Sequence, residues 1–463
     1  MIPIEINIVV EVTKGKLFNS KYANINKYNK ITSVCIDSRL AKKGSLFIAL
    51  KGKNIDGHDC IEDAIKRGAV AILIEKEVNI YTDRTIIQVK DNIKAIHELT
   101  KYYRSMLDIP ILALTGSSGK TTTKDIIYSV LQQKFNVHRT KGNQNNELGV
   151  PLTMFQIEKE TEIAVIEMGM NHQGEISKLV HMAVPDISII TNVGVSHMEH
   201  LGTKENIFKA KREILETLKD YQIALVNGDD EYLSTISDEK FKVVNFGIQN
   251  SESDIYATDI DSGTEGLKFR VHYKGNSEYF SFKFPGIHNV YNCITAIFLG
   301  KYYGLTFKQI QDGLQNYNPS NNRMDIRLVN NYTVINDSYN ANPDSMKAAL
   351  NVLTDYKSKD GRAIAVIGDM LEMGIESVKY HLEVGEFLAL KDIDYLVSVG
   401  QYAKYYISGA KNKGMESTVL THFENNKMAA DYLRSLLKAD DVILIKGSRG
   451  MSMEEILHLL ERS

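Results

Sequence analysis

Short, mostly apolar runs alternate with helix-like stretches along nearly the whole chain. The runs at 111–114, 163–166, 187–191 and 223–226 have the pattern of strands that are buried on both faces of a sheet. Between such runs lie stretches such as 204–219, in which apolar residues recur at helical spacing on one face. Alternation of this kind predicts an α/β fold with a mostly parallel sheet.

The pattern and the length of 463 residues predict three domains. We expect a small α/β domain at residues 1–105, a central domain with a mostly parallel sheet at 106–320, and a Rossmann-like α/β domain at 321–463. Residues 250–285 change to an alternating β-type pattern, which predicts an antiparallel section at the edge of the central sheet.

Composition narrows the class of protein. The formal net charge of -3 gives no general basic surface, so nucleic acid is not expected as a partner. The 3 cysteines are widely spaced and contain no Cys-x-x-Cys pair, which fits a reducing cytoplasm. No secretory leader and no apolar run long enough to span a bilayer is found, so we expect a cytoplasmic protein without a membrane span.

A Gly-x-x-Gly-Lys-Thr loop at 116–121 follows one of the apolar runs and precedes a helical stretch. Such a loop turns backbone N–H groups toward an anion at a helix N-terminus. Lys120 is then expected to reach the β- and γ-phosphates of a nucleotide, and the Thr121 hydroxyl to bind Mg²⁺. The full eight-residue pattern requires Gly where Leu114 stands, but the strand-loop-helix context favours a phosphate site over a Gly-rich turn.

Polar residues follow the next predicted strands of the central domain. Glu167 ends one strand, and Asn192 and His197 follow another. Ligands bind at the carboxyl ends of parallel strands. Glu167 is therefore a candidate Mg²⁺ ligand and His197 a candidate for a second cation site, although capping or hydrogen bonding remains an alternative for each.

Other polar residues have open interpretations. Asn289 and Asn292 lie three apart in the first turn of a predicted helix, where their amides can contact a base or cap the helix. The pattern alone makes Lys211 a surface charge. Loops rich in Asn, Asp and Gly follow predicted strands of the third domain at 337–343, 368–374 and 446–450, and their composition favours a ligand site.

In their order, these motifs resemble the Mur ligase family. The resemblance spans the chain and rests on 115–121, Glu167, 192–197, Ala210-Lys211, His288-Asn289 with Asn292, Asn322-Arg323-Met324 and 337–343. Within the family, the segments 37–39, 56–58, 337–346 and 368–372 most resemble members that join D-alanyl-D-alanine to a nucleotide-linked tripeptide.

The resemblance implies an activity in cytoplasmic peptidoglycan precursor synthesis. ATP would drive amide formation between UDP-N-acetylmuramoyl-tripeptide and D-alanyl-D-alanine through an acyl phosphate, in a monomeric enzyme whose catalysis is mainly positioning and charge neutralisation. The alternatives are the family member that adds the third amino acid, a folylpolyglutamate synthase relative, and a nucleotide-switched binding module. The stretch 336–343 argues against the first two.

The resemblance also implies roles for individual residues. ATP would be bound by Thr115, Gly116, Ser117, Ser118, Gly119, Lys120, Thr121, Thr122, Asn289, Asn292, Arg323 and Asp337. The implied catalytic residues are Lys120, Lys211, His197 and Glu167, with Mg²⁺ on Thr121, Glu167, His197 and, if it is carbamylated, Lys211. The uridine end would be held by Ser38, Arg39, Asp56, Gly57 and His58, and the dipeptide side by Asn340, Asn342 and Ser345.

Arg323 and Asp337 lie beyond the central domain in the sequence. If both contact ATP, the third domain must move onto the second. We therefore expect open and closed forms with a hinge at 318–325.

Overall fold

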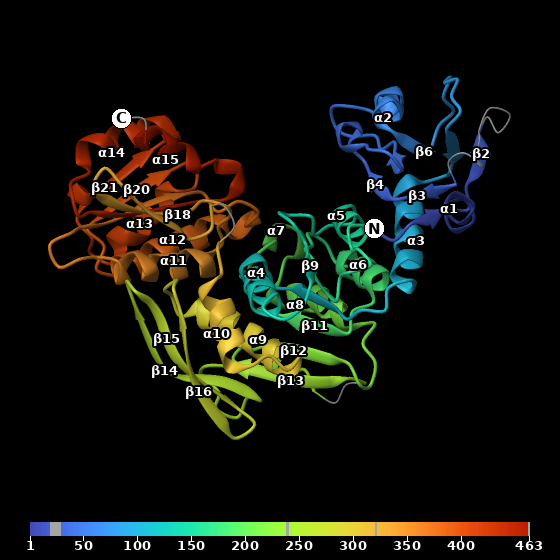
Figure 1. Cartoon of the computed structure of the whole chain (residues 1–463). Coiled ribbons are helices and arrows are strands. Elements are labelled where there is room, and N and C mark those ends of the chain that lie inside the picture. The colour runs from blue at the N-terminus through green and yellow to red at the C-terminus, as the bar shows by residue number, and fades with distance from the viewer. Residues whose placement is uncertain (19–28, 238–239, 320–321, 462–463) are drawn as a thin grey trace.

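The computed structural model describes residues 1–18, 29–237, 240–319 and 322–461. It contains three α/β units, each built around its own sheet (Figure 1). The fold class predicted from the sequence is therefore confirmed.

The N-terminal unit has a five-stranded sheet in the order β2-β7-β6-β5-β4. Its strands are β2 (Lys16–Phe18), β4 (Ser33–Cys35), β5 (Ser45–Ile48), β6 (Ala69–Ile74) and β7 (Thr85–Gln88), and a separate pair is formed by β1 (Ile4–Glu5) and β3 (Lys30–Ile31). Its helices are α1 (Ile6–Thr13), α2 (Ile61–Arg67) and α3 (Asn92–Ser105), with short 3₁₀ turns η1 (Ser38–Leu40) and η2 (Gly57–Cys60).

The central unit has a nine-stranded sheet in the order β16-β15-β14-β13-β12-β11-β8-β10-β9. The strands are β8 (Ile111–Thr115), β9 (Val137–Arg139), β10 (Ile163–Glu167), β11 (Ile187–Ile190), β12 (Ile223–Asn227), β13 (Lys242–Gly247), β14 (Ile255–Gly263), β15 (Gly266–Tyr273) and β16 (Asn276–Phe282). Strands β8 to β14 pair in parallel. The predicted antiparallel edge is confirmed, because β14, β15 and β16 pair antiparallel.

Helices cover both faces of this sheet. They are α4 (Lys120–Leu131), α5 (Gly149–Met154), α6 (Glu175–Ala183), α7 (Met198–Leu201), α8 (Lys204–Arg212), α9 (His288–Tyr302) and α10 (Phe307–Gln315). Every residue of β8, β10 and β12 is buried, which explains why these strands are nearly continuous apolar runs in the sequence.

The helix predicted at 204–219 is shorter than expected. It ends at Arg212 and continues as the 3₁₀ turn η3 (Glu213–Leu215). The Glu213 carboxylate accepts hydrogen bonds from the backbone N–H groups of Gly174 at 2.7 Å and Ser177 at 3.0 Å. These bonds to the start of α6 hold the chain in the tighter turn, and the sequence period does not reveal them.

The C-terminal unit has a six-stranded sheet in the order β17-β18-β22-β19-β20-β21. The strands are β17 (Asp325–Val329), β18 (Tyr332–Asp337), β19 (Ala363–Gly368), β20 (Tyr395–Val399), β21 (Leu420–Phe423) and β22 (Val442–Lys446). The helices are α11 (Pro343–Asp355), α12 (Ser377–Ala389), α13 (Lys404–Asn412), α14 (Asn426–Leu436) and α15 (Glu454–Glu461). The three polar loops follow β18, β19 and β22, which are neighbours in the sheet.

The chain passes from the central to the C-terminal unit in a short stretch. Asn318 accepts a hydrogen bond from Lys283 of the central unit at 3.2 Å, whereas Asn322 accepts one from Asn336 of the C-terminal unit at 3.1 Å. Of the hinge predicted at 318–325, residues 320 and 321 lie outside the described part of the chain.

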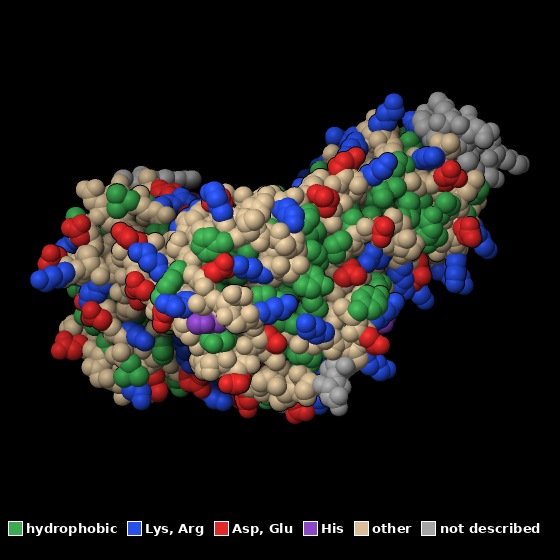
Figure 2. All heavy atoms as spheres, turned by 60° about the horizontal axis from the view of Figure 1, so that its bottom comes forward, with side chains coloured by type: hydrophobic (Ala, Val, Ile, Leu, Met, Phe, Trp, Pro, Cys, Tyr) green, Lys and Arg blue, Asp and Glu red, His purple; other side chains and the backbone are tan. Residues whose placement is uncertain are grey.

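The surface carries both signs of charge. On the face seen in Figure 2, basic and acidic side chains are interspersed. Within the described ranges, no helix is both long and apolar enough to cross a membrane.

Candidate active site

The phosphate loop connects β8 to α4 in a conformation that requires glycine at two positions. Gly119 has φ +77°, a region that other residues rarely adopt. A Cβ at Gly116 would lie only 1.8 Å from Oγ1 of Thr191. Glycine is therefore required at 119 by the backbone conformation, and at 116 by the close approach of Thr191, just after β11.

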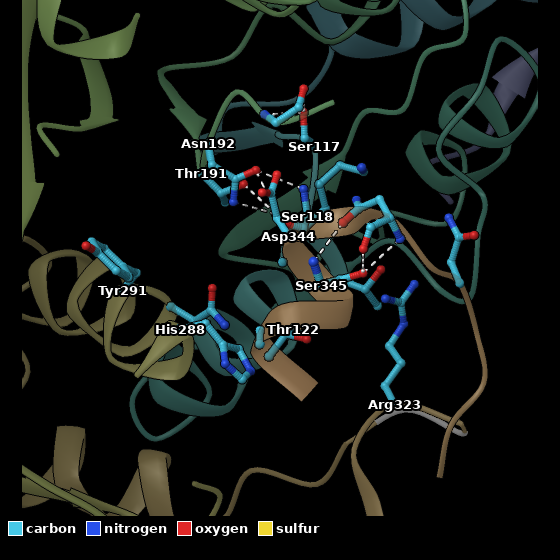
Figure 3. A pocket seen from close by; sticks show the side chains of 18 of the residues that line it. Ser117, Ser118, Thr122, Thr191, Asn192, His288, Tyr291, Arg323, Asp344 and Ser345 are labelled. Atoms are coloured by element: carbon cyan, nitrogen blue, oxygen red, sulfur yellow. Dashed lines mark hydrogen bonds between the residues drawn. The ribbon is translucent and has the colours of Figure 1, made fainter. Parts of the chain in front are cut away.

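Asn192, just after β11, holds the first half of this loop. Its backbone carbonyl accepts from Ser117 N–H at 3.1 Å, and its side-chain Oδ1 accepts from Ser118 N–H at 2.9 Å (Figure 3). These two N–H groups are thus engaged within the protein. The N–H groups of the first turn of α4 and the Lys120 ammonium are the remaining anion donors of the loop.

A cavity of about 820 Å³ lies between the phosphate loop and the C-terminal unit. In Figure 3, Asp344 and Ser345 of α11 approach the phosphate loop, and Arg323 extends toward the cavity from another segment. The predicted residues that line the cavity are Ser117, Ser118, Gly119, Lys120, Thr121, Thr122, Glu167, His197, Asn289, Asn292, Arg323, Asp337, Asn340, Asn342 and Ser345. Thr115, Gly116 and Lys211 are not part of its lining.

Glu167 lies at the floor of this cavity and is 2% exposed. Its Oε1 accepts from Asn145 Nδ2 at 2.8 Å and from Thr121 Oγ1 at 3.3 Å. Its Oε2 is buried and accepts no hydrogen bond from the described residues. Its charged neighbour is the Lys124 ammonium, at 3.4 Å, and a buried carboxylate next to a threonine hydroxyl is an oxygen donor set that fits a Mg²⁺ ion.

A buried chain of charges supports Glu167 and was missed in the sequence. Lys124, which is 1% exposed, lies 3.4 Å from Glu167 Oε2 and 3.5 Å from Asp125 Oδ1. Arg139 contacts the same Asp125 oxygen at 2.7 Å. Burial raises the pKa of Asp125, and the charges of Lys124 and Arg139 oppose this shift. The only sign of this charge network in the sequence is Lys124 itself, a lysine in the predicted helix after the phosphate loop.

Lys211 is buried, in contrast to the surface charge that its sequence pattern predicts. It is 1% exposed, and no carboxylate of the described residues lies within ion-pair distance. Burial and the nearby Lys120 ammonium lower the pKa of Lys211 well below its usual value. Burial also lowers the pKa of Lys120, with Glu167 opposing and Arg323 reinforcing the shift.

His197 lies in the field of these two lysines. Burial lowers its pKa, the hydrogen bond that His197 donates to the Glu372 carboxylate opposes the shift, and the charges of Lys120 and Lys211 lower the pKa further. The imidazole is therefore neutral near pH 7, the form in which histidine binds metal ions.

Asn289 and Asn292 are tied to neighbouring groups while they line the cavity. Asn289 Nδ2 donates to the Pro285 carbonyl at 2.7 Å, and Asn292 Nδ2 donates to Asn289 Oδ1 at 3.1 Å. Asn292 Oδ1 accepts from Thr123 of α4 at 2.9 Å. The amides thus brace α9 against the phosphate-loop helix.

On the C-terminal side, Arg323 and Asp337 each have a partner that the sequence did not indicate. The Arg323 guanidinium lies 3.8 Å from the ring centroid of Tyr339, a stacking contact that leaves its N–H donors available. Asp337 forms an ion pair with the buried Lys446 and accepts from Met324 N–H at 3.2 Å.

The residues predicted for the dipeptide side have structural partners. Asn342 is the N-cap of α11 and forms a capping box with Ser345. Its Nδ2 also donates to Ser196 Oγ of the central unit at 2.6 Å, while the carbonyl of Asn340 accepts from Lys446 at 2.9 Å. These bonds fix the loop after β18 at the edge of the cavity.

The residues predicted for the uridine end lie in the N-terminal unit, outside this cavity. The turns that carry them, η1 with Ser38 and Arg39 and η2 with Gly57 and His58, both pack against α2. The Asp56 carboxylate is 2.7 Å from His58 Nδ1. The structure thus brings the two motifs to one helix of the N-terminal unit.

Comparison with known proteins agrees with this arrangement. Residues 30–107 match the catalytic domain of the Mur ligase family, residues 114–300 the Mur ligase middle domain, and residues 322–449 the Mur ligase, glutamate ligase domain. The UDP-N-acetylmuramoyl-tripeptide--D-alanyl-D-alanine ligase of Bacillus subtilis (strain 168) is 36% identical over 459 residues, which cover 99% of this chain and 98% of that protein.

Two solved structures have the same fold over nearly the whole chain. A crystal structure of MurF from Acinetobacter baumannii has a TM-score of 0.89 at 30% identity and covers 100% of this chain and 99% of that one. The MurF ligase from Thermotoga maritima in complex with ADP has a TM-score of 0.82 at 28% identity and covers 93% and 97%. The chain belongs to the Mur ligase family.

Proposed function

We propose that this chain joins D-alanyl-D-alanine to the terminal carboxyl group of UDP-N-acetylmuramoyl-tripeptide with ATP, in the cytoplasmic assembly of the peptidoglycan precursor. The observation that carries the proposal is the convergence of the phosphate loop and the C-terminal loops on one cavity, in a chain that matches ligases of this name along its full length. Residues 1–105 would bind the uridine end, 106–320 ATP, and 321–463 the dipeptide, in a monomer.

The chemistry accounts for the charges around the cavity. A carboxylate is a poor acyl donor, and transfer of the γ-phosphoryl group from ATP converts it into an acyl phosphate with release of ADP. The dipeptide amine then attacks the carbonyl carbon, loses a proton, and expels phosphate. The first step brings two anions together, so Lys120 and Arg323 would act by neutralising charge.

Thr121 and Glu167 would hold one Mg²⁺ ion and His197 a second. When bound, Mg²⁺ neutralises phosphate charge and orients the phosphoryl oxygens. Asn289 and Asn292 would lie against the adenine, Asp337 against the ribose, and Asn340, Asn342 and Ser345 toward the dipeptide. Ser38, Arg39, Asp56, Gly57 and His58 would hold the uridine nucleotide.

Lys211 would carry a carbamate. An amine reacts with CO₂ in its neutral form, and burial beside Lys120 favours that form. The product is an anion, so the modification would turn a buried amine that has no carboxylate partner into a group that attracts Mg²⁺.

The proposal is tested by mass spectrometry of the product. The purified protein is mixed with ATP, Mg²⁺, D-alanyl-D-alanine and the nucleotide tripeptide, ending either in meso-diaminopimelate or in L-lysine. We expect the mass of the dipeptide adduct, and for Lys120→Ala a fall in rate of about 100-fold or more, because a transition-state charge is no longer neutralised.

Other outcomes would contradict the proposal. Product formation with single amino acids but not with the dipeptide would identify a different ligase of the family. Nucleotide binding without any product from these acceptors would indicate a binding module.

A further inference from the structure

The loop at 368–374, after β19, reaches from the C-terminal unit to the central unit through Glu372. The Glu372 carboxylate Oε2 lies 2.9 Å from Nδ1 of His197. The Glu372 carbonyl accepts from the N–H of Glu199 at 3.2 Å, in the first turn of α7. Gly374 adopts φ +56°, and a Cβ there would lie 3.1 Å from the Glu199 Cα, so the loop packs tightly against α7.

The loop is firmly held by its own unit. Leu371 N–H donates to Ser448 Oγ at 2.8 Å, and Met370 N–H donates to His381 Nε2 at 3.0 Å. The side chains of Met370 and Met373 on either side are 1% and 3% exposed. Glu372 thus projects from a rigid support and does not lie on a free surface loop.

Both ends of the Glu372–His197 contact are in an uncommon backbone conformation. His197 has φ +64° and Glu372 has φ +62°. Residues other than glycine occupy this region at a cost in free energy, and such positions concentrate at functional sites. The two strained positions meet at one hydrogen bond between units.

The chemistry of the imidazole gives this contact a purpose. The Glu372 carboxylate can only accept, so the proton of the neutral His197 ring lies on Nδ1. The other ring nitrogen, Nε2, then carries no proton and can accept a hydrogen bond or bind a metal ion. Metal-binding histidines commonly donate their second nitrogen to a carboxylate, which fixes the tautomer and the orientation of the ring. His197 lines the cavity, so Nε2 would be available to a metal ion bound there.

We propose that Glu372 is a positioning residue that holds His197 in the Nδ1-protonated tautomer, so that the cavity is complete only when the C-terminal unit is docked on the central unit. This inference rests on the role of His197 under the proposed function. It assigns a role to the polar loop after β19. The contacts proposed for ATP and the two substrates give this loop no role.

The first test needs neither metal nor substrate. Protein labelled with ¹⁵N-histidine is studied by NMR at pH 8, and the His197 signals are identified by their loss in His197→Asn. We expect the Nδ1-protonated tautomer in the unmodified chain and a shift toward the Nε2-protonated form in Glu372→Ala. Glu372→Gln, whose amide oxygen still accepts from Nδ1, retains the original tautomer.

The second test separates positioning from folding by kinetics. The control is Glu376→Gln, because Glu376 lies in the same segment and pairs with Lys379 at 3.1 Å. Loss of the carboxylate in Glu372→Ala lowers kcat by about 10- to 100-fold, the effect typical of removing a partner of a metal-binding histidine. KM for the nucleotide tripeptide stays within about twofold, and Glu372→Gln restores most of kcat.

Two results would overturn the inference. One is a His197 tautomer that is the same in Glu372→Ala as in the unmodified chain; the other is an equal loss of kcat in Glu376→Gln. If the unmodified chain fails to join the dipeptide, the proposed function falls, while the tautomer measurement still decides the role of Glu372.

Discussion

At the residue scale, two buried lysines of the central unit differ in their charged neighbours. Lys124 lies between two carboxylates, those of Glu167 and Asp125, whereas Lys211 has no such partner among the described residues and lies in the field of Lys120. A paired buried cation maintains the fold, because its removal leaves uncompensated anions. A buried lysine without a carboxylate partner is shifted toward its neutral amine, the form that is suited to chemical modification.

Lys124→Met should therefore destabilise the central unit. The substitution keeps much of the side-chain volume but leaves Glu167 and Asp125 without their shared ammonium, and we expect a loss of about 3 kcal/mol in the free energy of unfolding. Urea unfolding followed by circular dichroism measures it. Lys178→Met, at an exposed position of α6, is the control and should change the value by less than about 0.5 kcal/mol. Equal losses in both variants would contradict the interpretation.

Glu167 and the phosphate loop could be recognised in the sequence because their positions follow from local patterns. A polar residue directly after an apolar strand lies at the ligand-binding edge of a parallel sheet. Lys124 and Lys211 could not be recognised in this way, because helical spacing alone does not show which face of α4 or α8 is buried by other elements. The pattern around Lys211 even predicted a surface charge.

At the element scale, the polar loops of the C-terminal unit act partly as connectors. The Asp369 carboxylate accepts from the N–H groups of Gln401, Tyr402 and Ala403 at 2.9, 3.0 and 2.6 Å. Ser448 holds the loop after β19 by accepting from Leu371. Composition favoured a ligand site at these loops, but it could not separate hydrogen bonds between loops from bonds to a ligand.

The His381 contact with the loop after β19 predicts a pH dependence. Its Nε2 accepts from Met370 N–H and its Nδ1 is 2.7 Å from the Ser377 carbonyl, so the ring is neutral, and burial lowers its pKa from the usual 6.5. As the pH falls, His381 is therefore protonated at a higher pH in the unfolded chain than in the folded one. The free energy of unfolding of the C-terminal unit should thus fall as the pH drops below about 6.5 toward the lowered pKa.

His381→Gln removes the titrating group and keeps an acceptor for Met370. We expect the urea midpoint of this variant to depend less on pH between 7 and 5 than that of the unmodified chain. Identical slopes for the two proteins would show that His381 does not contribute.

At the scale of the whole molecule, the two joints between units differ. The N-terminal and central units share one hydrophobic cluster, which runs from Ile4 and Leu46 to Ile111 and Ile190. The Tyr103 hydroxyl of α3 also donates to the Ile157 carbonyl at 2.6 Å. The central and C-terminal units have separate hydrophobic clusters, with Val195 and Met198 of the central unit packed against the C-terminal one, and they also meet through polar contacts of Asn342 and Glu372. The second joint is therefore the one expected to open.

Small-angle scattering can detect this motion. We expect the radius of gyration to decrease when an ATP analogue and the nucleotide tripeptide are both added, because Arg323 and Asp337 on the C-terminal side would then contact the nucleotide. Profiles that superimpose with and without the two ligands would contradict the hinge predicted at 318–325.

The sequence predicted the three α/β units and the antiparallel edge of the central sheet, because long apolar runs and alternating segments leave clear periodic signals. It missed the short strands β9 and β17. Three or five residues at a sheet edge leave little periodicity, and their pairing is decided by neighbouring strands.

The shared cluster through α3 also determines how the protein should respond to heat. Two units with a common core melt together, because neither keeps its apolar surface covered once the other unfolds. Scanning calorimetry should therefore resolve two cooperative transitions, one for the fused N-terminal and central units and one for the C-terminal unit. Three separate peaks would mean that the cluster does not couple the first two units.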